Sequence, residues 1–327
     1  MATPLLEARD IRVYYHSVRG HYKVVDGVSF DVQPDEVLGI AGESGCGKST
    51  LVEALLRLIV PPGYIETGQV IAPEITAEVS NNCDLLSLSE EEFRQLRWKQ
   101  ISYIPQGSMN SLNPVMKIED QIIDVILTHS NTTRQEARRR VASLLQTVGL
   151  APEVAKLYPH ELSGGMKQRV AIAASIALQP KLIIADEPTT ALDVTIQKMV
   201  LQTLKRVKKA LGCTIIVVSH DMPVHAQIAD RLVIMYAGKV IEIASVYDIF
   251  GDPLHPYTRG LIATIPSIGE ERQRLAGIPG ASPSPLEWPE GCRFHPRCTE
   301  AMAICRTEEP PLLQVRPGRF VACHLHR

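Results

Sequence analysis

A glycine-rich loop between a buried strand and a helix constrains this chain more than any other segment. The apolar run at 37–41 is typical of a buried parallel strand, and the composition at 50–59 is helical before a Pro-Pro-Gly sequence ends it. Between them lies Gly42-Glu43-Ser44-Gly45-Cys46-Gly47-Lys48-Ser49-Thr50, hereafter the phosphate loop. Its three glycines let backbone N–H groups and the positive end of the helix approach a phosphate. We expect Lys48 to reach the β- and γ-phosphates of a nucleotide and Ser49 to bind Mg2+.

Two further apolar runs end in polar residues that suit hydrolysis. The run at 182–185 is followed by Asp186 and Glu187, and the run at 213–218 is followed by Ser219 and then His220. Asp186 is expected to hold Mg2+ through water, and Glu187 to polarise an attacking water as a general base. At the same sheet edge, His220 is expected to hydrogen-bond the γ-phosphate and that water.

A second short segment narrows the function further. Leu162-Ser163-Gly164-Gly165-Met166, hereafter the signature segment, opens an apolar stretch at 166–179 that predicts a buried helix. Together with the phosphate loop it resembles the ATP-binding cassette family, whose members sandwich ATP between the phosphate loop of one subunit and this segment of another. The resemblance implies that the signature segment and Gln168 act on the partner's ATP.

The resemblance assigns further roles by position. It implies that Gln106 senses Mg2+ and water, that His220 is the switch histidine, and that Ala191-Leu192-Asp193 crosses the dimer interface. The family stacks an aromatic ring on adenine from an early strand. Tyr15 fits that place best, with Tyr14 and Tyr22 as alternatives.

The expected fold is α/β, with a P-loop NTPase core, an antiparallel β subdomain, a helical subdomain and a small irregular C-terminal metal-binding extension. We expect an ATPase domain at 1–250, with the helical subdomain at about 85–160, and an extension at 251–327. Antiparallel strands are predicted in 1–40, with Asp26-Gly27 as a turn. A basic amphipathic helix is predicted at 133–148, and a closing hairpin at 231–243.

The extension sharpens the resemblance to the oligopeptide and dipeptide branch of importer ATPases. That branch carries a His-Pro-Tyr segment, found here at 255–257, and a cysteine-bearing tail. The sequence departs from the pattern of that branch at Gly107, the residue after Gln106, where many relatives have Asp. The resemblance implies a peripheral protein at the cytoplasmic face of the membrane. Its partners would be a second, distinct ATPase subunit, two transmembrane permease subunits and, indirectly, an extracytoplasmic substrate-binding protein. Some members carry oligosaccharides or nickel instead.

Four of the 7 cysteines lie within the last 36 residues, at Cys292, Cys298, Cys305 and Cys323. An ATP-hydrolysing protein works in a reducing compartment, which disfavours disulfides. The irregular spacing favours a 4Fe-4S cluster, and Zn2+ is the alternative, although the C-x2-C pair typical of structural zinc is absent. Cys83 and Cys213 are expected to be structural.

Composition excludes several function classes. A net charge of −2 argues against a dedicated nucleic-acid binder. No apolar run approaches the ~20 residues of a membrane span, and the N-terminus lacks the pattern of a secretory signal. A soluble cassette ATPase acting on DNA or ribosomes stays open as an alternative. The single phosphate loop and the absence of long heptad repeats favour the transporter. A GTPase is disfavoured, because the sequence lacks the N-K-x-D segment that reads guanine.

Overall fold

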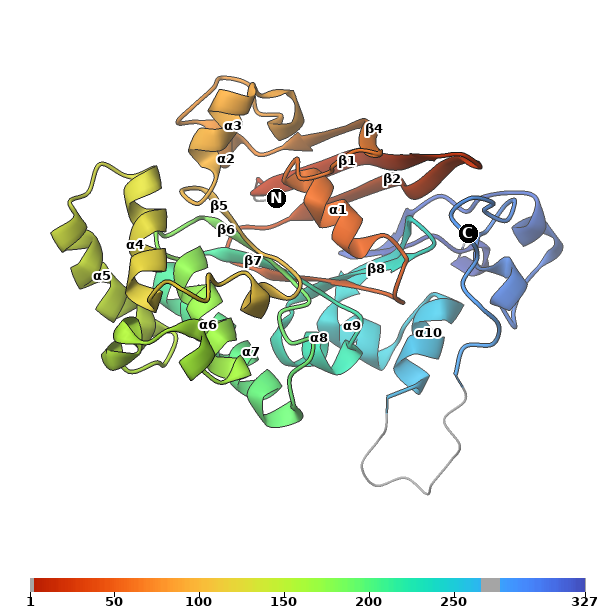
Figure 1. Cartoon of the computed structure of the whole chain (residues 1–327). Helices are drawn as coiled ribbons and strands as arrows, with labels where there is room; N and C mark the ends of the chain where they lie inside the picture. Colours follow the sequence, from red (N-terminus) through yellow and green to blue (C-terminus); the bar gives the residue numbers. More distant parts are fainter. Residues whose placement is uncertain (1–2, 266–276, 327) are drawn as a thin grey trace.

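The computed structural model describes residues 3–265 and 277–326, and it contains two sheets with helix α1 (Lys48–Leu55) between them (Figure 1). A three-stranded sheet covers one side of α1, and an eight-stranded sheet lies on the other. Further helices, among them α6 and α7, cover the far face of the larger sheet. In the described part of the chain no helix combines the length and the apolar character that a bilayer span requires.

The eight-stranded sheet carries the phosphate loop. Its strand order is β10-β11-β9-β8-β3-β7-β6-β5, and neighbours are parallel from β8 to β5 and antiparallel elsewhere. Every residue of β3, β6 and β7 is buried, as expected of parallel strands covered on both faces. This confirms the three predicted strands. The bounds are β3 Val37–Ala41, β5 Ile101–Ile104, β6 Leu182–Asp186, β7 Thr214–Ser219, β8 Arg231–Tyr236, β9 Lys239–Ser245, β10 Leu313–Arg316 and β11 Arg319–Val321.

The smaller sheet has the order β2-β1-β4 and is antiparallel, with bounds β1 Leu6–Ser17, β2 Gly20–Val32 and β4 Gly63–Ile71. The prediction of a turn at Asp26-Gly27 is wrong. Both residues lie inside β2, where Ile11 pairs with Val28 and Arg12 pairs with Asp26. Gly27, at φ 80°, is therefore the extra residue of a β-bulge. The chain reverses instead between β1 and β2. Asp-Gly suits both structures, because each needs a residue with positive φ.

The predicted closing hairpin is confirmed by β8 and β9. Ala237 and Gly238 connect the two strands with φ angles of 49° and 78°, the left-handed pair that a tight two-residue hairpin requires.

The helical side is built from α4, α5 and α6, which share one apolar cluster with β6 and β7. Thr133 caps α5 through a reciprocal bond with Glu136, which confirms the predicted start of that helix. The range 85–160 also contains β5, a strand of the central sheet. The helix bounds are α1 Lys48–Leu55, α2 Pro73–Thr76, α3 Glu90–Leu96, α4 Ile118–His129, α5 Arg134–Thr147, α6 Gly164–Ser175, α7 Val194–Leu211, α8 Met222–Ile228, α9 Val246–Gly251 and α10 Pro256–Ala263.

The extension at 251–327, of which 266–276 and 327 lie outside the described residues, is joined to the ATPase core. Strand β11 pairs with β9, so β11 and β10 lengthen the central sheet. Phe294 packs on Tyr236 of β8 and Tyr257 of α10, with ring centroids 5.2 and 5.4 Å away. The prediction of an irregular extension missed these two strands, because the long connection from β9 leaves no local pairing signal.

Candidate nucleotide site

The carboxyl ends of three adjacent parallel strands bring the predicted site residues to one edge of the sheet. Ala41, the last residue of β3, pairs with Ser219 at the end of β7, and Val218 pairs with Asp186 at the end of β6. The phosphate loop follows Ala41 directly. Open α/β sheets bind ligands at this kind of edge.

Close packing dictates the glycines of the phosphate loop. A Cβ on Gly47 would lie 2.6 Å from the carbonyl oxygen of Val24, and one on Gly42 would lie 2.2 Å from that of Met235. Both glycines also have positive φ. Cys46 is buried, and burial raises the pKa of its thiol, so it packs the loop as a small neutral residue. Ser44 and Gly45 are exposed, which leaves the outer part of the loop open to a ligand.

Lys48 begins α1 and is almost fully buried. Its Nζ donates to the carbonyl oxygens of Gly42 and Glu43, at 2.8 and 3.0 Å. The ammonium group is thus held at the loop and has no carboxylate partner among the described residues. A buried cation without a protein counter-charge at a helix N-terminus suits an anionic ligand.

Asp186 and Ser49 supply oxygen atoms for a cation. Burial raises the pKa of the Asp186 carboxyl, and a hydrogen bond with Ser49 opposes part of this rise. Tyr103 donates to Asp186 Oδ2 at 3.4 Å, while the buried Oδ1 has no hydrogen-bond partner in the described structure. A carboxylate with an unsatisfied oxygen beside a hydroxyl matches the donor set of Mg2+.

Glu187 and His220 meet as predicted. Glu187 Oε1 accepts a hydrogen bond from the His220 backbone N–H at 3.1 Å and lies 2.7 Å from His220 Nδ1. Its Oε2 accepts from Thr190 Oγ1 at 3.0 Å. Glu187 has φ 47°, the left-handed region, and is 9% exposed. The sheet edge therefore fixes this carboxylate next to Asp186, while the His220 side chain stays 53% exposed.

The signature segment forms the exposed N-terminus of α6. Ser163 accepts a hydrogen bond from the Met166 backbone N–H, and Ser163 and Gly164 face solvent. A Cβ on Gly164 would lie 3.6 Å from Leu192, so the signature segment and the loop at 191–193 lie side by side. Asp193 caps α7 by accepting from the N–H groups of Thr195 and Ile196. Ala191 is exposed with φ 63°.

Gln168, three residues after Gly165, is buried in this chain. It is 3% exposed, and its Oε1 accepts a hydrogen bond from Ser108 at 2.9 Å. Within this chain Gln168 therefore ties α6 to the segment after β5, and its role at the partner's ATP stays a prediction. Gln106, two residues before Ser108, is exposed.

The three tyrosines proposed for adenine differ in environment. The Tyr15 ring packs against Gly63, where an added Cβ would lie 2.6 Å from its Cε1, and joins the core around α1. Tyr14 donates to Asp26 Oδ1 at 2.9 Å. Tyr22 pairs with Tyr15 across β1 and β2 and is half-buried. The assignment of adenine to Tyr15 stays a prediction.

The four cysteines of the extension are free thiols that lie near one another. Burial raises the pKa of Cys292 to about 11, with smaller contributions from Cys305, Cys323 and Cys298. The Cys292 backbone N–H donates to the Cys305 carbonyl oxygen at 2.9 Å. Within 3–265 and 277–326, however, no three Cys, His, Asp or Glu side chains are arranged to hold a metal ion.

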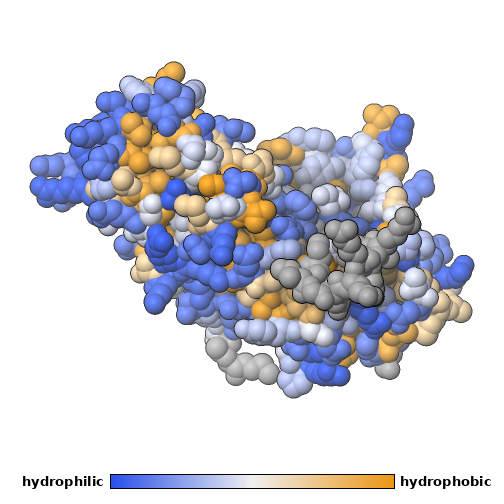
Figure 2. All heavy atoms as spheres, turned by 90° about the horizontal axis from the view of Figure 1, so that it is seen from below, coloured by the Kyte–Doolittle hydropathy of each residue, from blue (hydrophilic) through white to orange (hydrophobic). Residues whose placement is uncertain are grey.

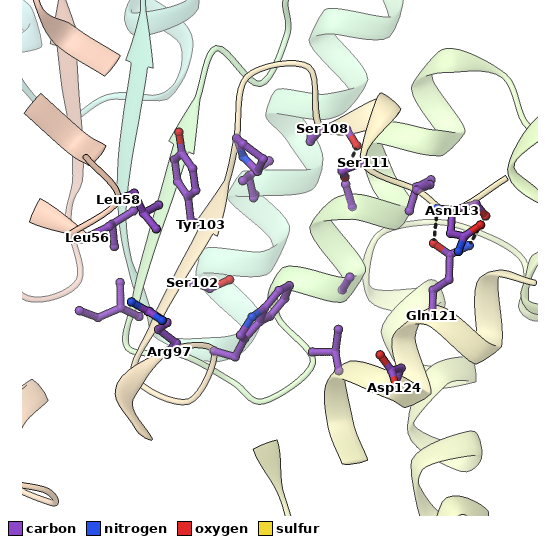
Figure 3. A pocket seen from close by; sticks show the side chains of 18 of the residues that line it. Leu56, Leu58, Arg97, Ser102, Tyr103, Ser108, Ser111, Asn113, Gln121 and Asp124 are labelled. Atoms are coloured by element: carbon purple, nitrogen blue, oxygen red, sulfur yellow. Dashed lines mark hydrogen bonds between the residues drawn. The ribbon is translucent and has the colours of Figure 1, made fainter. Parts of the chain in front are cut away.

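A largely apolar groove of about 610 Å3 lies between the core and the helical side (Figure 3). Leu56 and Leu58 border it from the end of α1, Tyr103 from β5, and Asp124 from α4. Its polar rim is ordered, because the Asn113 backbone N–H donates to Gln121 Oε1 at 2.9 Å. This groove was not predicted from the sequence. The signal available was the segment Ser111-Leu112-Asn113-Pro114, three of whose residues line it.

Comparison with known proteins identifies the family. A model described as "ABC transporter" matches residues 25–190, and one described as "Oligopeptide/dipeptide transporter, C-terminal region" matches residues 241–305. The chain belongs to the ABC transporter family. It is an ATP-binding subunit with the C-terminal region of the oligopeptide/dipeptide branch, and the family activity is ATP hydrolysis.

Relatives match this ABC ATPase over nearly its whole length. It is 42% identical to the dipeptide transport ATP-binding protein DppD of Caldanaerobacter subterraneus over 324 residues, which cover 98% of this chain and 97% of the relative. It is 43% identical to the oligopeptide transport ATP-binding protein AppD of Bacillus subtilis, with the same coverage. The solved dimer of the ATP-binding cassette MJ0796 with bound ADP and Pi superposes with a TM-score of 0.63 at 26% identity, covering 74% of this chain and 98% of MJ0796.

We predict that Lys48→Met removes ATP binding without unfolding the protein. Methionine retains the buried stem of Lys48 but not the ammonium group that balances the phosphates. At about 100 times its dissociation constant, MgATP should stabilise the wild-type protein by about 2.7 kcal/mol and shift its thermal transition upward. The variant should show no shift. An equal shift in both proteins would place the nucleotide elsewhere.

Proposed function

We propose that this ABC ATPase powers a membrane importer of dipeptides or oligopeptides. The observation that carries the substrate class is the match of residues 241–305 to the C-terminal region of oligopeptide/dipeptide transporters. The relatives named above, which align from end to end, are dipeptide and oligopeptide transport proteins. The chain would act at the cytoplasmic face of the membrane, as a peripheral subunit.

The residues at the sheet edge would carry out ATP hydrolysis. Lys48 and the N–H groups of the phosphate loop would bind the phosphates. Ser49, Asp186 and Gln106 would hold Mg2+, which would supply positive charge to neutralise the phosphates. Glu187 accepts a proton from the attacking water, and His220, fixed against Glu187 Oε1, orients that water and the γ-phosphate.

The complete site would need a second subunit. Ser163, Gly164 and the loop at 191–193 form one exposed surface, and no hydrogen bond or ion pair joins Ser163 to the phosphate loop in the described structure. The MJ0796 cassette with bound ADP and Pi is itself a dimer. We propose a head-to-tail pair with a distinct homologous chain, in which each signature segment completes the other's site.

The surface supports a pair that opens and closes. Figure 2 shows the face seen from below, the side of α6 and α7 in Figure 1, where apolar patches are interrupted by hydrophilic surface. Such mixed surfaces are typical of non-obligate interfaces. On α7, Val194, which follows Asp193 directly, and Met199 are exposed apolar residues.

The groove of about 610 Å3 is our candidate for the contact with the two transmembrane permease subunits. It is largely apolar, large enough for side chains of a short helix, and bordered by the exposed Leu58. Tyr103 both lines this groove and donates to Asp186. A permease helix seated there would therefore touch a residue bonded to the Mg2+ ligand. The extracytoplasmic substrate-binding protein would act through the permease.

For the tail, we propose that Cys292, Cys298, Cys305 and Cys323 bind a 4Fe-4S cluster, with Zn2+ as the alternative metal. The support is the donor chemistry of four free thiols in the extension. Because no three of them surround one position in the described residues, cluster binding would have to draw them together. The cluster would have a structural role, because these thiols lie outside the nucleotide site.

We expect Glu187→Gln to bind ATP but to hydrolyse it at least ~100-fold more slowly, because glutamine keeps the size of the Glu187 side chain and one accepting oxygen but cannot act as the general base. The assay uses the transporter assembled with its permease and partner subunits in proteoliposomes, and measures ATP hydrolysis and uptake of labelled peptides. Uptake should fall with hydrolysis, and the ATP-bound dimer should persist.

Glu36→Gln is the matched control, since Glu36 is 7% exposed and precedes the opposite end of β3. It should lower stability while leaving turnover near normal. Normal hydrolysis by Glu187→Gln would remove Glu187 from the mechanism. Wild-type proteoliposomes that hydrolyse ATP yet take up no peptide would overturn the substrate class.

Protein purified without oxygen should be brown and contain about four irons and four labile sulfides per chain. Cys298→Ser should lose the colour while still binding ATP, whereas Cys83→Ser, outside the tail, should keep the iron. Metal analysis and absorption spectra decide the outcome. A colourless protein with about one zinc per chain would replace the cluster by the zinc alternative.

A further inference from the structure

The extension contacts the phosphate loop at Glu43. Arg297 donates to both oxygens of the Glu43 carboxylate, from Nη1 to Oε2 at 2.7 Å and from Nη2 to Oε1 at 3.0 Å. The hydroxyl oxygen of Tyr257 accepts a hydrogen bond from the Glu43 backbone N–H at 2.8 Å. Both the side chain and the backbone of one phosphate-loop residue are therefore held by residues far along the chain.

Neither contact is a loose surface pair. Tyr257 is fully buried, and the Arg297 side chain is 6% exposed. Arg297 Nε also donates to the Pro279 carbonyl oxygen at 2.8 Å, and its guanidinium lies over the Tyr236 ring, 5.7 Å from the centroid. The rings of Tyr257 and Tyr236 pack with centroids 4.7 Å apart. Two-pronged pairs of this kind fix orientation as well as charge.

The pair solves an electrostatic problem of this loop. The loop binds a polyanion, yet Glu43 places a carboxylate in it, one residue after Gly42. An unpaired carboxylate there would repel the phosphates, and pairing with Arg297 cancels its charge. Glu43 matters also for Lys48, whose Nζ donates to the Glu43 carbonyl oxygen. The position of Glu43 thus affects where the ammonium group rests.

We propose that Arg297 and Tyr257 are positioning residues of the ATP site, which set the affinity for ATP by holding Glu43. The proposal rests on ATP binding at the phosphate loop, as in the function proposed above. It gives the extension a part in nucleotide binding, in addition to any metal it carries. At saturating ATP the chemistry at Glu187 is unaffected, so KM changes and kcat does not.

The test is Arg297→Gln in the full-length chain, assayed for MgATP affinity alone and for KM and kcat in the assembled transporter. We expect about a tenfold rise in Kd and KM, with kcat within about twofold of wild type, because the freed carboxylate opposes binding. Arg297→Lys keeps the charge but not the two-pronged geometry, so its Kd and KM should lie between those of the wild type and of Arg297→Gln. The double variant Glu43→Gln/Arg297→Gln should bind ATP better than Arg297→Gln, because no carboxylate is left unpaired.

Arg319→Gln is the matched control. Arg319 is another buried arginine of the extension, paired with Asp252 at 3.0 Å and away from the phosphate loop. Arg319→Gln should destabilise the extension, which would lower the temperature of the thermal transition, and should leave KM for ATP unchanged. An equal rise in KM for Arg319→Gln and Arg297→Gln would show general loosening and overturn the proposal.

Tyr257→Phe provides an independent variant, since it keeps the ring packing and removes only the oxygen that accepts from Glu43. We expect about a threefold rise in KM. If Arg297→Gln does not fold, Tyr257→Phe alone tests whether the extension positions Glu43. Unchanged KM in the folded variants would refute the positioning role. Failure of the wild-type chain itself to bind MgATP would instead contradict the nucleotide site.

Discussion

The parallel pairing of β8, β3, β7 and β6 is the constraint on which the rest of the structure depends. Parallel strands end at one edge, and that edge receives the phosphate loop from β3, Asp186 and Glu187 from β6, and His220 after β7. Each segment is unremarkable alone, and only their common edge places a buried ammonium, an unsatisfied carboxylate oxygen and a bonded Glu–His pair within one site. Close packing enforces the loop, since carbonyl groups of neighbouring strands exclude a side chain at Gly42 and Gly47.

Much of the site follows from the sequence because its signals are local. An apolar strand followed by Asp-Glu, or by glycines and Lys48, can be recognised in the sequence before the fold is known. Three features could not be found this way. Asp26-Gly27 satisfies both a turn and a bulge, and only the register of β1 with β2 selects the bulge. Gln168 follows the exposed signature segment, but the helix turns it inward toward Ser108. The Arg297–Glu43 pair joins residues 254 positions apart, a distance over which no pattern carries information.

The nucleotide site has contacts on two sides. On one side, Tyr103 connects Asp186 with the apolar groove proposed for the permease. On the other, Arg297 and Tyr257 connect Glu43 with the extension, whose strands continue the same sheet. The extension thus shares its apolar packing, through Phe294 and Tyr236, with the strand beside β3. In this arrangement a change in the extension would reach the phosphate loop through the Arg297–Glu43 ion pair and the hydrogen bond between Tyr257 and Glu43.

We propose that this chain holds only half of each catalytic site. The most direct measurement is the rate of ATP hydrolysis per chain across a dilution series whose oligomeric state is measured in parallel. We predict that the rate per chain falls toward zero as the protein becomes monomeric, and rises steeply when the partner and permease subunits are added. Full activity in a demonstrably monomeric preparation would contradict a site completed by a second signature segment.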